Sequence, residues 1–192
     1  MAKILENLYR ALGLGFVLAI VIFAVAHGKQ VGDAQFWQFF VRWLHVLFGI
    51  LWIGLLWYFN FVQIPTMPKV PAELKKGVSG YIAPEALFWF RWAALGTVVA
   101  GLALAELNGY GNKNLIQFTA PLIAIGMWLG LIMAANVWFI IWPNQKKALG
   151  IVVVEAPEKA KAARLAMLTS RANTMLSIPM LYCMVLQQNG GL

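Results

Sequence analysis

The sequence predicts an all-α fold, an integral membrane bundle of five transmembrane helices. Hydrophobic residues make up 61% of the chain and charged residues only 11%, whereas a soluble domain carries about 25% charged residues. The apolar residues form runs close to the roughly 20 helical residues that cross a bilayer, and such runs are too long for barrel strands. Because no polar domain separates these runs, we expect residues 1–192 to form a single membrane domain.

Polar residues, glycines or prolines bound each predicted span. The first span follows a basic N-terminus, and no cleavage site of small residues precedes His27, so we interpret it as a retained span and not as a signal peptide. Pro65 and Pro143 are expected to end the second and fourth spans, and residues 84–85 suit the start of the third. Pro157 begins a helix that continues into the fifth span. The predicted spans are about 11–26, 36–63, 86–107, 118–142 and 165–186.

Lysine and arginine residues flank the spans unevenly. Most lie on the side of the N-terminus, and of the loop residues only Lys29 and Lys113 lie on the other side. The positive-inside rule therefore predicts a cytoplasmic N-terminus and a periplasmic C-terminus in a bacterial inner membrane. The net charge of +8 does not indicate nucleic-acid binding, because the basic residues lie next to apolar runs and not on a polar face.

The second span carries an arginine and a histidine three residues apart, Arg42 and His45. This spacing places both side chains on one face of a helix, and Trp52 lies on the same face. Ionisable residues in a membrane span normally face protein or a cavity, so a functional site is the default hypothesis. In the alternative interpretation, Arg42 reaches the membrane surface and His45 forms a hydrogen bond to a neighbouring helix.

A haem group is one hypothesis for this face of the second span. Histidine is a common axial ligand of haem iron, so His45 is the candidate metal ligand, and Arg42 and Trp52 are candidate cofactor-binding residues. The other histidine, His27, lies about two turns too shallow to face His45 across one ring. Haem b is the expected form, since no Cys-x-x-Cys-His site for covalent haem c exists. Candidate sixth ligands are Met127, Met180 and Met184. A histidine that only forms hydrogen bonds or carries protons is the alternative.

A second group of polar residues is predicted at one level in the cytoplasmic half of the membrane. Arginine offers paired donors and asparagine offers both a donor and an acceptor, so the group would suit an anionic, planar molecule with several hydrogen-bonding atoms. Mutual hydrogen bonds between helices are the alternative. The candidate substrate-binding residues are Asn60, Arg91, Asn136, Arg171 and Asn173.

Other kinds of chemistry lack the residues they need. Every acidic residue lies at a terminus, in a loop or near the end of a span, which argues against proton pumping by carboxylates. The sequence has neither a metal-binding cluster nor a catalytic triad. Small residues repeat every four positions, at Ala93, Thr97, Gly101 and Ala105 and again at Gly126, Gly130 and Ala134. Such stripes are typical of close helix packing.

Four segments together resemble the membrane domain of the bacterial cytochrome c-linked urate oxidase family (PuuD type). They are residues 52–65, 86–92, 136–146 and 170–179. The resemblance implies a membrane oxidoreductase that passes electrons from urate to cytochrome c. In that family a cytochrome c domain follows the membrane part, whereas this sequence ends at Leu192 without one, so we expect the acceptor to be a separate c-type cytochrome.

A shorter resemblance concerns the histidine itself. Residues 43–45 followed by residues 52–54 are similar to the first helix of haem-binding membrane oxidases that act on protoporphyrinogen. The preferred hypothesis is therefore an inner-membrane electron-transfer protein that binds haem near His45. The alternatives are a non-catalytic accessory subunit of a larger membrane complex and a protein that binds or transports a small molecule.

Overall fold

The computed structural model describes residues 2–28 and 31–189, and the regular elements in those ranges are all helices. The prediction of an all-α fold is therefore confirmed for the described chain. Residue contacts divide the chain into two compact units, residues 1–40 and residues 41–192, here called unit 1 and unit 2. Lys29 and the side chain of His27, which the sequence analysis used, lie outside what the structure describes.

Unit 1 contains the first predicted span. A short helix, α1 (Ala2–Leu5), precedes α2 (Leu8–His27), and α3 (Ala34–Trp57) begins in this unit. The side chain of Asn7 caps α2 by accepting a hydrogen bond from the backbone N–H of Arg10 over 3.1 Å. The 20 residues of α2 extend over about 30 Å, which is long enough to cross the hydrocarbon layer.

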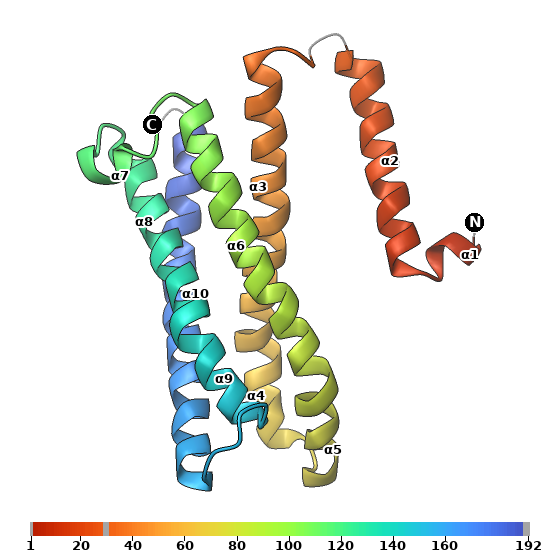
Figure 1. Cartoon of the computed structure of the whole chain (residues 1–192), viewed down its shortest axis with the longest axis vertical. Coiled ribbons are helices and arrows are strands. Elements are labelled where there is room, and N and C mark those ends of the chain that lie inside the picture. The colour runs from red at the N-terminus through yellow and green to blue at the C-terminus, as the bar shows by residue number, and fades with distance from the viewer. Residues whose placement is uncertain (1, 29–30, 190–192) are drawn as a thin grey trace. The chain divides into compact units, whose positions relative to one another are not determined.

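Unit 2 is a bundle of four long helical segments within residues 41–189, and successive segments run in opposite directions (Figure 1). The first segment comprises α3, η2 (Tyr58–Gln63), α4 (Ile64–Thr66) and η3 (Met67–Lys69). The second comprises α5 (Ala72–Gly77), η4 (Val78–Ile82) and α6 (Ala83–Leu107). After the short α7 (Asn114–Gln117), the third comprises α8 (Pro121–Ala135), η5 (Asn136–Ile141) and α9 (Trp142–Leu149), and the fourth is α10 (Ala156–Gln188).

Four helical segments of the described chain are long and apolar enough to cross a membrane: Leu8–Ala26, Ala34–Lys69, Ala72–Leu107 and Pro121–Leu149. These correspond to the first four predicted spans. The fifth predicted span lies within α10, whose 33 residues are long enough. Its polar residues, Ser170, Arg171, Asn173 and Thr174 among them, make α10 much less apolar than the other segments. A fifth crossing therefore stays a prediction.

Three prolines that were expected to mark helix boundaries lie inside continuous helical segments. Pro65, Pro84 and Pro143 each lie two residues after the end of a π-helix, η2, η4 and η5 respectively. In an α-helix, a proline lacks the N–H for the bond to the carbonyl four residues earlier, and its ring clashes with that carbonyl.

The π-helices explain why these helices continue. The residue before each proline donates its backbone N–H to the carbonyl five residues earlier: Ile64 to Phe59, Ala83 to Val78 and Trp142 to Val137. This spacing widens the turn that the proline ring would otherwise enter. The predictions that Pro65 and Pro143 end helices and that Pro84 starts one were therefore wrong, because local proline chemistry does not reveal a change in hydrogen-bond spacing.

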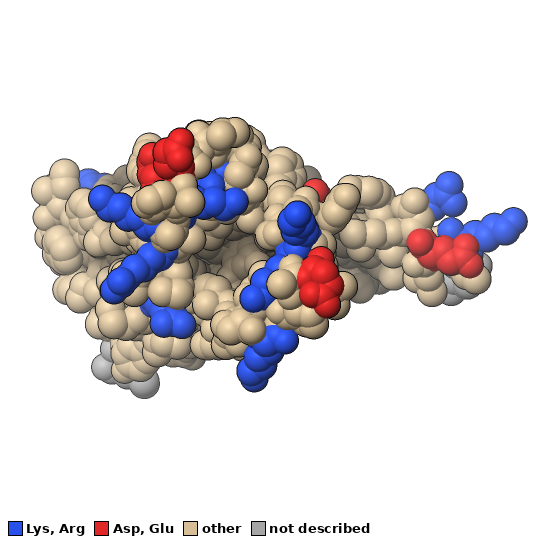
Figure 2. Space-filling view, turned by 90° about the horizontal axis from the view of Figure 1, so that it is seen from below, with Lys and Arg blue, Asp and Glu red and all other residues tan. Residues whose placement is uncertain are grey.

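The two ends of unit 2 differ in charge. We call them the α5 end, with α5, α9 and the start of α10, and the α7 end, with α7 and the C-terminal part of α10 (Figure 1). Figure 2 views the α5 end, where lysine and arginine side chains surround a hollow in the surface. At this end lie Lys69, Lys75, Lys76, Lys146, Lys147, Lys159, Lys161 and Arg164, whereas Lys113 lies at the α7 end.

The core of unit 2 is apolar and lies between the four segments. Its largest fully buried side chains include Trp52, Leu56, Phe90, Met133 and Val137. Phe59 and Phe90 pack edge to face with ring centroids 5.7 Å apart, a geometry that aromatic pairs prefer. Many large apolar side chains also lie on the outside of the helices, for example Ile50, Phe61, Val99, Phe139 and Tyr182, as expected for surfaces that face lipid.

Candidate functional site

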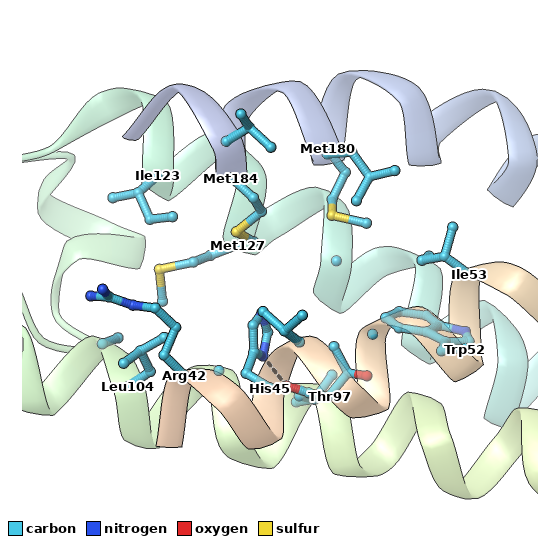
Figure 3. Close-up of a pocket in the computed structure, with 18 of the residues that line it drawn as sticks. Arg42, His45, Trp52, Ile53, Thr97, Leu104, Ile123, Met127, Met180 and Met184 are labelled. Atoms are coloured by element: carbon cyan, nitrogen blue, oxygen red, sulfur yellow. Dashed lines mark hydrogen bonds between the residues drawn. The ribbon is translucent and has the colours of Figure 1, made fainter. Parts of the chain in front are cut away.

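A cavity of about 630 Å³ lies between α3, α6, α8 and α10. This volume falls within the roughly 300–1,000 Å³ typical of small-molecule sites. Most of its wall is apolar, with Val46, Ile50, Ile53, Leu102, Ile123 and Leu131 among the lining residues. The predicted cofactor-binding residues Arg42, His45 and Trp52 all line this one cavity (Figure 3). Their helical spacing on α3 brings them there.

His45 is fixed by a hydrogen bond to the neighbouring helix. Its Nδ1 lies 2.8 Å from the backbone carbonyl oxygen of Thr97 on α6 (Figure 3). Because a carbonyl oxygen can only accept, Nδ1 must carry the proton in this bond. In the neutral imidazole, Nε2 then has a free lone pair, which is the state that binds a metal ion. A metal-binding histidine commonly donates its other ring N–H in this way.

The small-residue stripe on α6 makes this contact possible. A Cβ atom at Gly101 would lie 2.9 Å from Cε1 and 3.1 Å from Nδ1 of His45. Gly101 therefore allows the imidazole to lie against the backbone of α6, beside the carbonyl of Thr97. The small-residue stripe predicts helix packing for Thr97 and Gly101 and not a role in the site. The four-residue spacing of the stripe indicated that another helix packs closely against this face of α6. It could not indicate that a backbone carbonyl on this face accepts a hydrogen bond from His45.

Methionine side chains line the wall opposite His45. Met127 extends from α8, and Met180 and Met184 extend from α10 into the cavity (Figure 3). These are the three residues that the sequence analysis named as candidate sixth ligands. A thioether sulfur is a known axial ligand of haem iron in cytochromes c. A free imidazole nitrogen, three methionine side chains and an apolar wall would suit a flat, largely apolar iron complex, which His45 would hold.

Two further polar groups at the cavity are left without partners. The side chain of Trp52 is only 1% exposed, and its indole Nε1 is buried without a hydrogen-bond acceptor. Arg42 donates from Nη2 to Oδ1 of Asn108 over 3.2 Å, and its Nε is buried without a partner. A buried polar group without a partner costs about 1–3 kcal/mol, so both atoms are energetically unfavourable beside the cavity.

The predicted substrate-binding residues lie closer to the α5 end, where α10 presents polar side chains to two neighbours. Asn136, the first residue of η5, donates to Oδ1 of Asn173 over 2.8 Å, and Asn173 donates to the carbonyl of Met133 over 2.9 Å. Asn60 in η2 donates to Oγ of Ser170 over 2.8 Å. Three of the five predicted residues therefore form hydrogen bonds between α10 and a neighbouring helix. We call the group made of Asn60, Gln63, Asn136, Ser170 and Asn173 the polar layer.

The two arginines of that prediction lie apart from these bridges. Arg91 donates to the carbonyl of Leu87 over 3.0 Å, and its guanidinium carbon lies 3.4 Å from the centre of the Trp142 ring. This geometry is a close cation–π contact. Arg171 is exposed on α10. The polar layer also contains two buried acceptors without partners, Oδ1 of Asn60 and Oε1 of Gln63, and Gln63 was not among the predicted residues.

Comparison with family models gives one match. Residues 105–189, less than half of the 192-residue chain, match the model described as Urate oxidase N-terminal. The matched region runs from the end of α6 to the end of α10, so it includes Asn136, Asn173 and the three cavity methionines but neither Arg42 nor His45. Comparison with curated proteins and comparison with solved structures gave no match. The second half of the chain is thus similar to the N-terminal part of urate oxidase.

Proposed function

We propose that this protein is an electron-transfer protein of the oxidoreductase type in the bacterial inner membrane. It binds haem b through Nε2 of His45 and passes electrons to a separate c-type cytochrome. The observation that carries this proposal is the bond between His45 and the carbonyl of Thr97, which leaves the metal-binding nitrogen free beside an apolar cavity. Haem b, when bound, supplies a one-electron redox centre.

The residues around the cavity have separate roles in this proposal. The carbonyl of Thr97 fixes the orientation and tautomer of His45, and Gly101 gives the ring its space. The apolar wall excludes water, and a cavity methionine would offer a thioether donor that raises the reduction potential of the group. Of the three cavity methionines, Met184 already packs against α8, since a Cβ atom at Gly126 would lie 3.6 Å from its sulfur.

The distribution of charge supports an orientation in the membrane. The basic α5 end would face the cytoplasm, in keeping with the positive-inside rule. The cavity lies towards the α7 end, which would then face the periplasm, where c-type cytochromes accept electrons. The proposal includes α10 as a fifth crossing, because its 33 residues pack along the other segments of unit 2.

The polar layer is the proposed site for the electron donor, a planar N–H-rich anion of the urate class. The unpaired acceptors of Asn60 and Gln63 would receive N–H groups of such a molecule, and the exposed Arg171 would supply positive charge near the cytoplasmic surface. The match of residues 105–189 to the urate oxidase N-terminal model supports this choice of substrate class.

Absorbance spectra of the purified protein test the cofactor. We expect the wild-type protein in mild detergent to show a Soret band that shifts on reduction. His45→Gly should lose the band and regain it when free imidazole is added, because imidazole fills the space of the missing ring. The matched control is His27→Gly, which removes the other of the two histidines and should keep the band.

Two results would overturn the proposal. The first is a His45→Gly protein that elutes as a single species and keeps its full Soret band without imidazole. The second is a wild-type protein that has no chromophore after purification, does not bind added haem and elutes with a larger complex, which would favour an accessory subunit. Reduction of the wild-type haem by urate, followed by oxidation by a c-type cytochrome, tests the electron donor and the acceptor separately.

A further inference from the structure

Arg42 lies at the α7 end of the cavity with little to balance its positive charge. Among the residues that the structure describes, the one ion pair within 4.0 Å joins Lys147 and Glu158 at the other end of unit 2. The guanidinium of Arg42 thus has a single neutral acceptor, Oδ1 of Asn108, and its Nε is buried without any partner. A charge beside an apolar cavity is costly unless a counter-charge reaches it.

The groups around Arg42 are donors as well. The amide of Asn108 donates to the hydroxyl oxygen of Tyr110 over 3.3 Å, which fixes its carbonyl side towards Arg42. That bond does not use the hydroxyl proton of Tyr110, and Tyr110 lines the cavity. The acid at the end of α6 is Glu106, whose carboxylate accepts the backbone N–H of Asn112 over 2.7 Å. The α7 end of the cavity therefore presents donors from Arg42 and Tyr110.

The loop that carries Tyr110 is held in place by its backbone. Gly109 and Gly111 have positive φ values of 82° and 65°, which favour glycine. The N–H of Gly111 donates to the carbonyl of Ala105 over 2.9 Å, which closes the end of α6. Tyr110 thus lies in a tight turn that a backbone hydrogen bond closes.

We propose that Arg42 and Tyr110 form a carboxylate-binding subsite at the α7 end of the cavity. The cavity ligand would then be a largely apolar body that carries its carboxylate at that end. Arginine and a carboxylate form paired, charge-assisted hydrogen bonds, which are among the strongest in proteins. This inference rests on the proposed function where the carboxylates are the propionates of haem b, and it also fits an acyl-chain carboxylate from the membrane.

The test compares acids with their esters. Wild-type protein stripped of ligand is titrated with iron protoporphyrin IX and with its dimethyl ester, which keeps the iron and ring but removes the charge. We expect the ester to bind about tenfold more weakly, a difference of about 1.4 kcal/mol, because it cannot form charge-assisted hydrogen bonds. In Arg42→Met the acid should fall to the affinity of the ester, and in Tyr110→Phe the preference should shrink about threefold.

The controls separate charge recognition from folding and from iron ligation. Lys113→Met removes one positive charge from an exposed position at the same end and should keep the full preference for the acid. Binding of the dimethyl ester, with the spectrum of the His45-ligated iron, shows that Arg42→Met is folded. A wild-type protein that binds acid and ester equally, or an Arg42→Met protein that still prefers the acid, would overturn the subsite for haem.

If no porphyrin binds, the proposed function is refuted, but the carboxylate subsite is not. A second pair of ligands then tests the subsite. The fluorescent fatty acid cis-parinaric acid is compared with its methyl ester, again in wild type, Arg42→Met and Lys113→Met. A preference for the acid that only Arg42→Met loses would assign the subsite to an acyl carboxylate. Equal binding of acid and ester in both ligand pairs would contradict the carboxylate subsite altogether.

Discussion

The two halves of unit 2 use similar polar side chains in different ways. In the polar layer near the α5 end, Asn136 and Asn173 bond to each other and to the backbone, so they hold α8 and α10 together. In the cavity near the α7 end, His45 and Arg42 each bond once to a neighbouring element and keep further polar atoms free. The bonds of Asn136 and Asn173 are those of helix packing, whereas the free polar atoms of His45 and Arg42 are those of a ligand site.

The helices of the two halves also differ in regularity. The π-helices η2, η4 and η5 all lie in the half near the α5 end, whereas the cavity is lined mainly by regular α-helix. A site on regular helices is well positioned, because its side chains depend on packing that the whole bundle maintains. Substitutions should therefore separate the two groups of residues: changes at Asn136 and Asn173 should alter stability, and changes at the cavity should alter haem binding.

The largest effect is expected for Asn173→Ala in the polar layer. Asn173 is 0% exposed and bridges Asn136 and Met133. Its loss leaves the side-chain N–H of Asn136 without its acceptor, removes one of the two bonds to the carbonyl of Met133 and opens a small cavity, at a cost of about 3 kcal/mol in the free energy of unfolding. The melting temperature in detergent should fall clearly, while the haem affinity of the folded protein stays within about twofold of the wild type.

Asn189→Ala is the matched control for this change. Its side chain also donates to a backbone carbonyl, that of Val185 over 2.9 Å, but at an exposed position at the end of α10. Its melting temperature should stay close to that of the wild type. If Asn173→Ala abolished haem binding at temperatures where the protein remains folded, the separation between the two halves would be refuted.

The next largest effect is expected for Gly101→Ala at the cavity. The added methyl group would lie 2.9 Å from Cε1 of His45, so the imidazole must move away from the carbonyl of Thr97. Misplacing the ligand should cost about 2 kcal/mol, or roughly 30-fold in haem affinity. Titration of the stripped protein with haem measures this change, and Gly130→Ala is the control, because nothing lies within 4 Å of its added Cβ in the same cavity. Equal affinities for the two variants would argue that the position of His45 does not matter.

The sequence predicted the cavity residues of α3 better than their surroundings. Arg42, His45 and Trp52 were placed together because helical spacing within one segment fixes which side chains share a face. Thr97 and Asn108 were not found, because their contacts with His45 and Arg42 join residues 52 and 66 positions apart. Such contacts depend on how far one helix slides along another, which side-chain packing decides.

Proline positions misled the prediction of helix ends for a different reason. Proline cannot donate the backbone hydrogen bond of an α-helix, so the sequence predicts helix boundaries at Pro65, Pro84 and Pro143. The chain instead changes to π-helix just before each of them. The polar layer was predicted as a level in the membrane, but its pairing, such as Asn60 with Ser170, was not. A single sequence predicts how deep in the membrane a residue lies along its helix. It does not predict which residue of a neighbouring helix that side chain contacts.

A smaller effect is expected for Ser177→Ala, between the two halves. Ser177 accepts a hydrogen bond from Nε1 of Trp57 over 3.0 Å and donates to the carbonyl of Thr174 over 2.7 Å. Trp57 lines the cavity, so its unpaired indole should cost about 1 kcal/mol in stability and shift the Soret band slightly. Ser79→Ala, which removes only a bond within its own helical segment, should change neither. A variant with unchanged melting temperature and spectrum would show that the two halves are not connected through Trp57.

The smallest effect is expected for Pro143→Ala at the end of η5. Because the π-helix already accommodates the ring, the substitution relieves no strain, and it should cost only about 0.5 kcal/mol through greater freedom of the unfolded chain. Pro179 provides the contrast, since it lies inside α10 with no π-helix before it. Pro179→Ala restores an N–H donor for the carbonyl of Met175 and should raise the melting temperature. A higher melting temperature for Pro143→Ala as well would mean that Pro143 strains η5. The π-helices near the α5 end would then not be explained as an accommodation of their prolines.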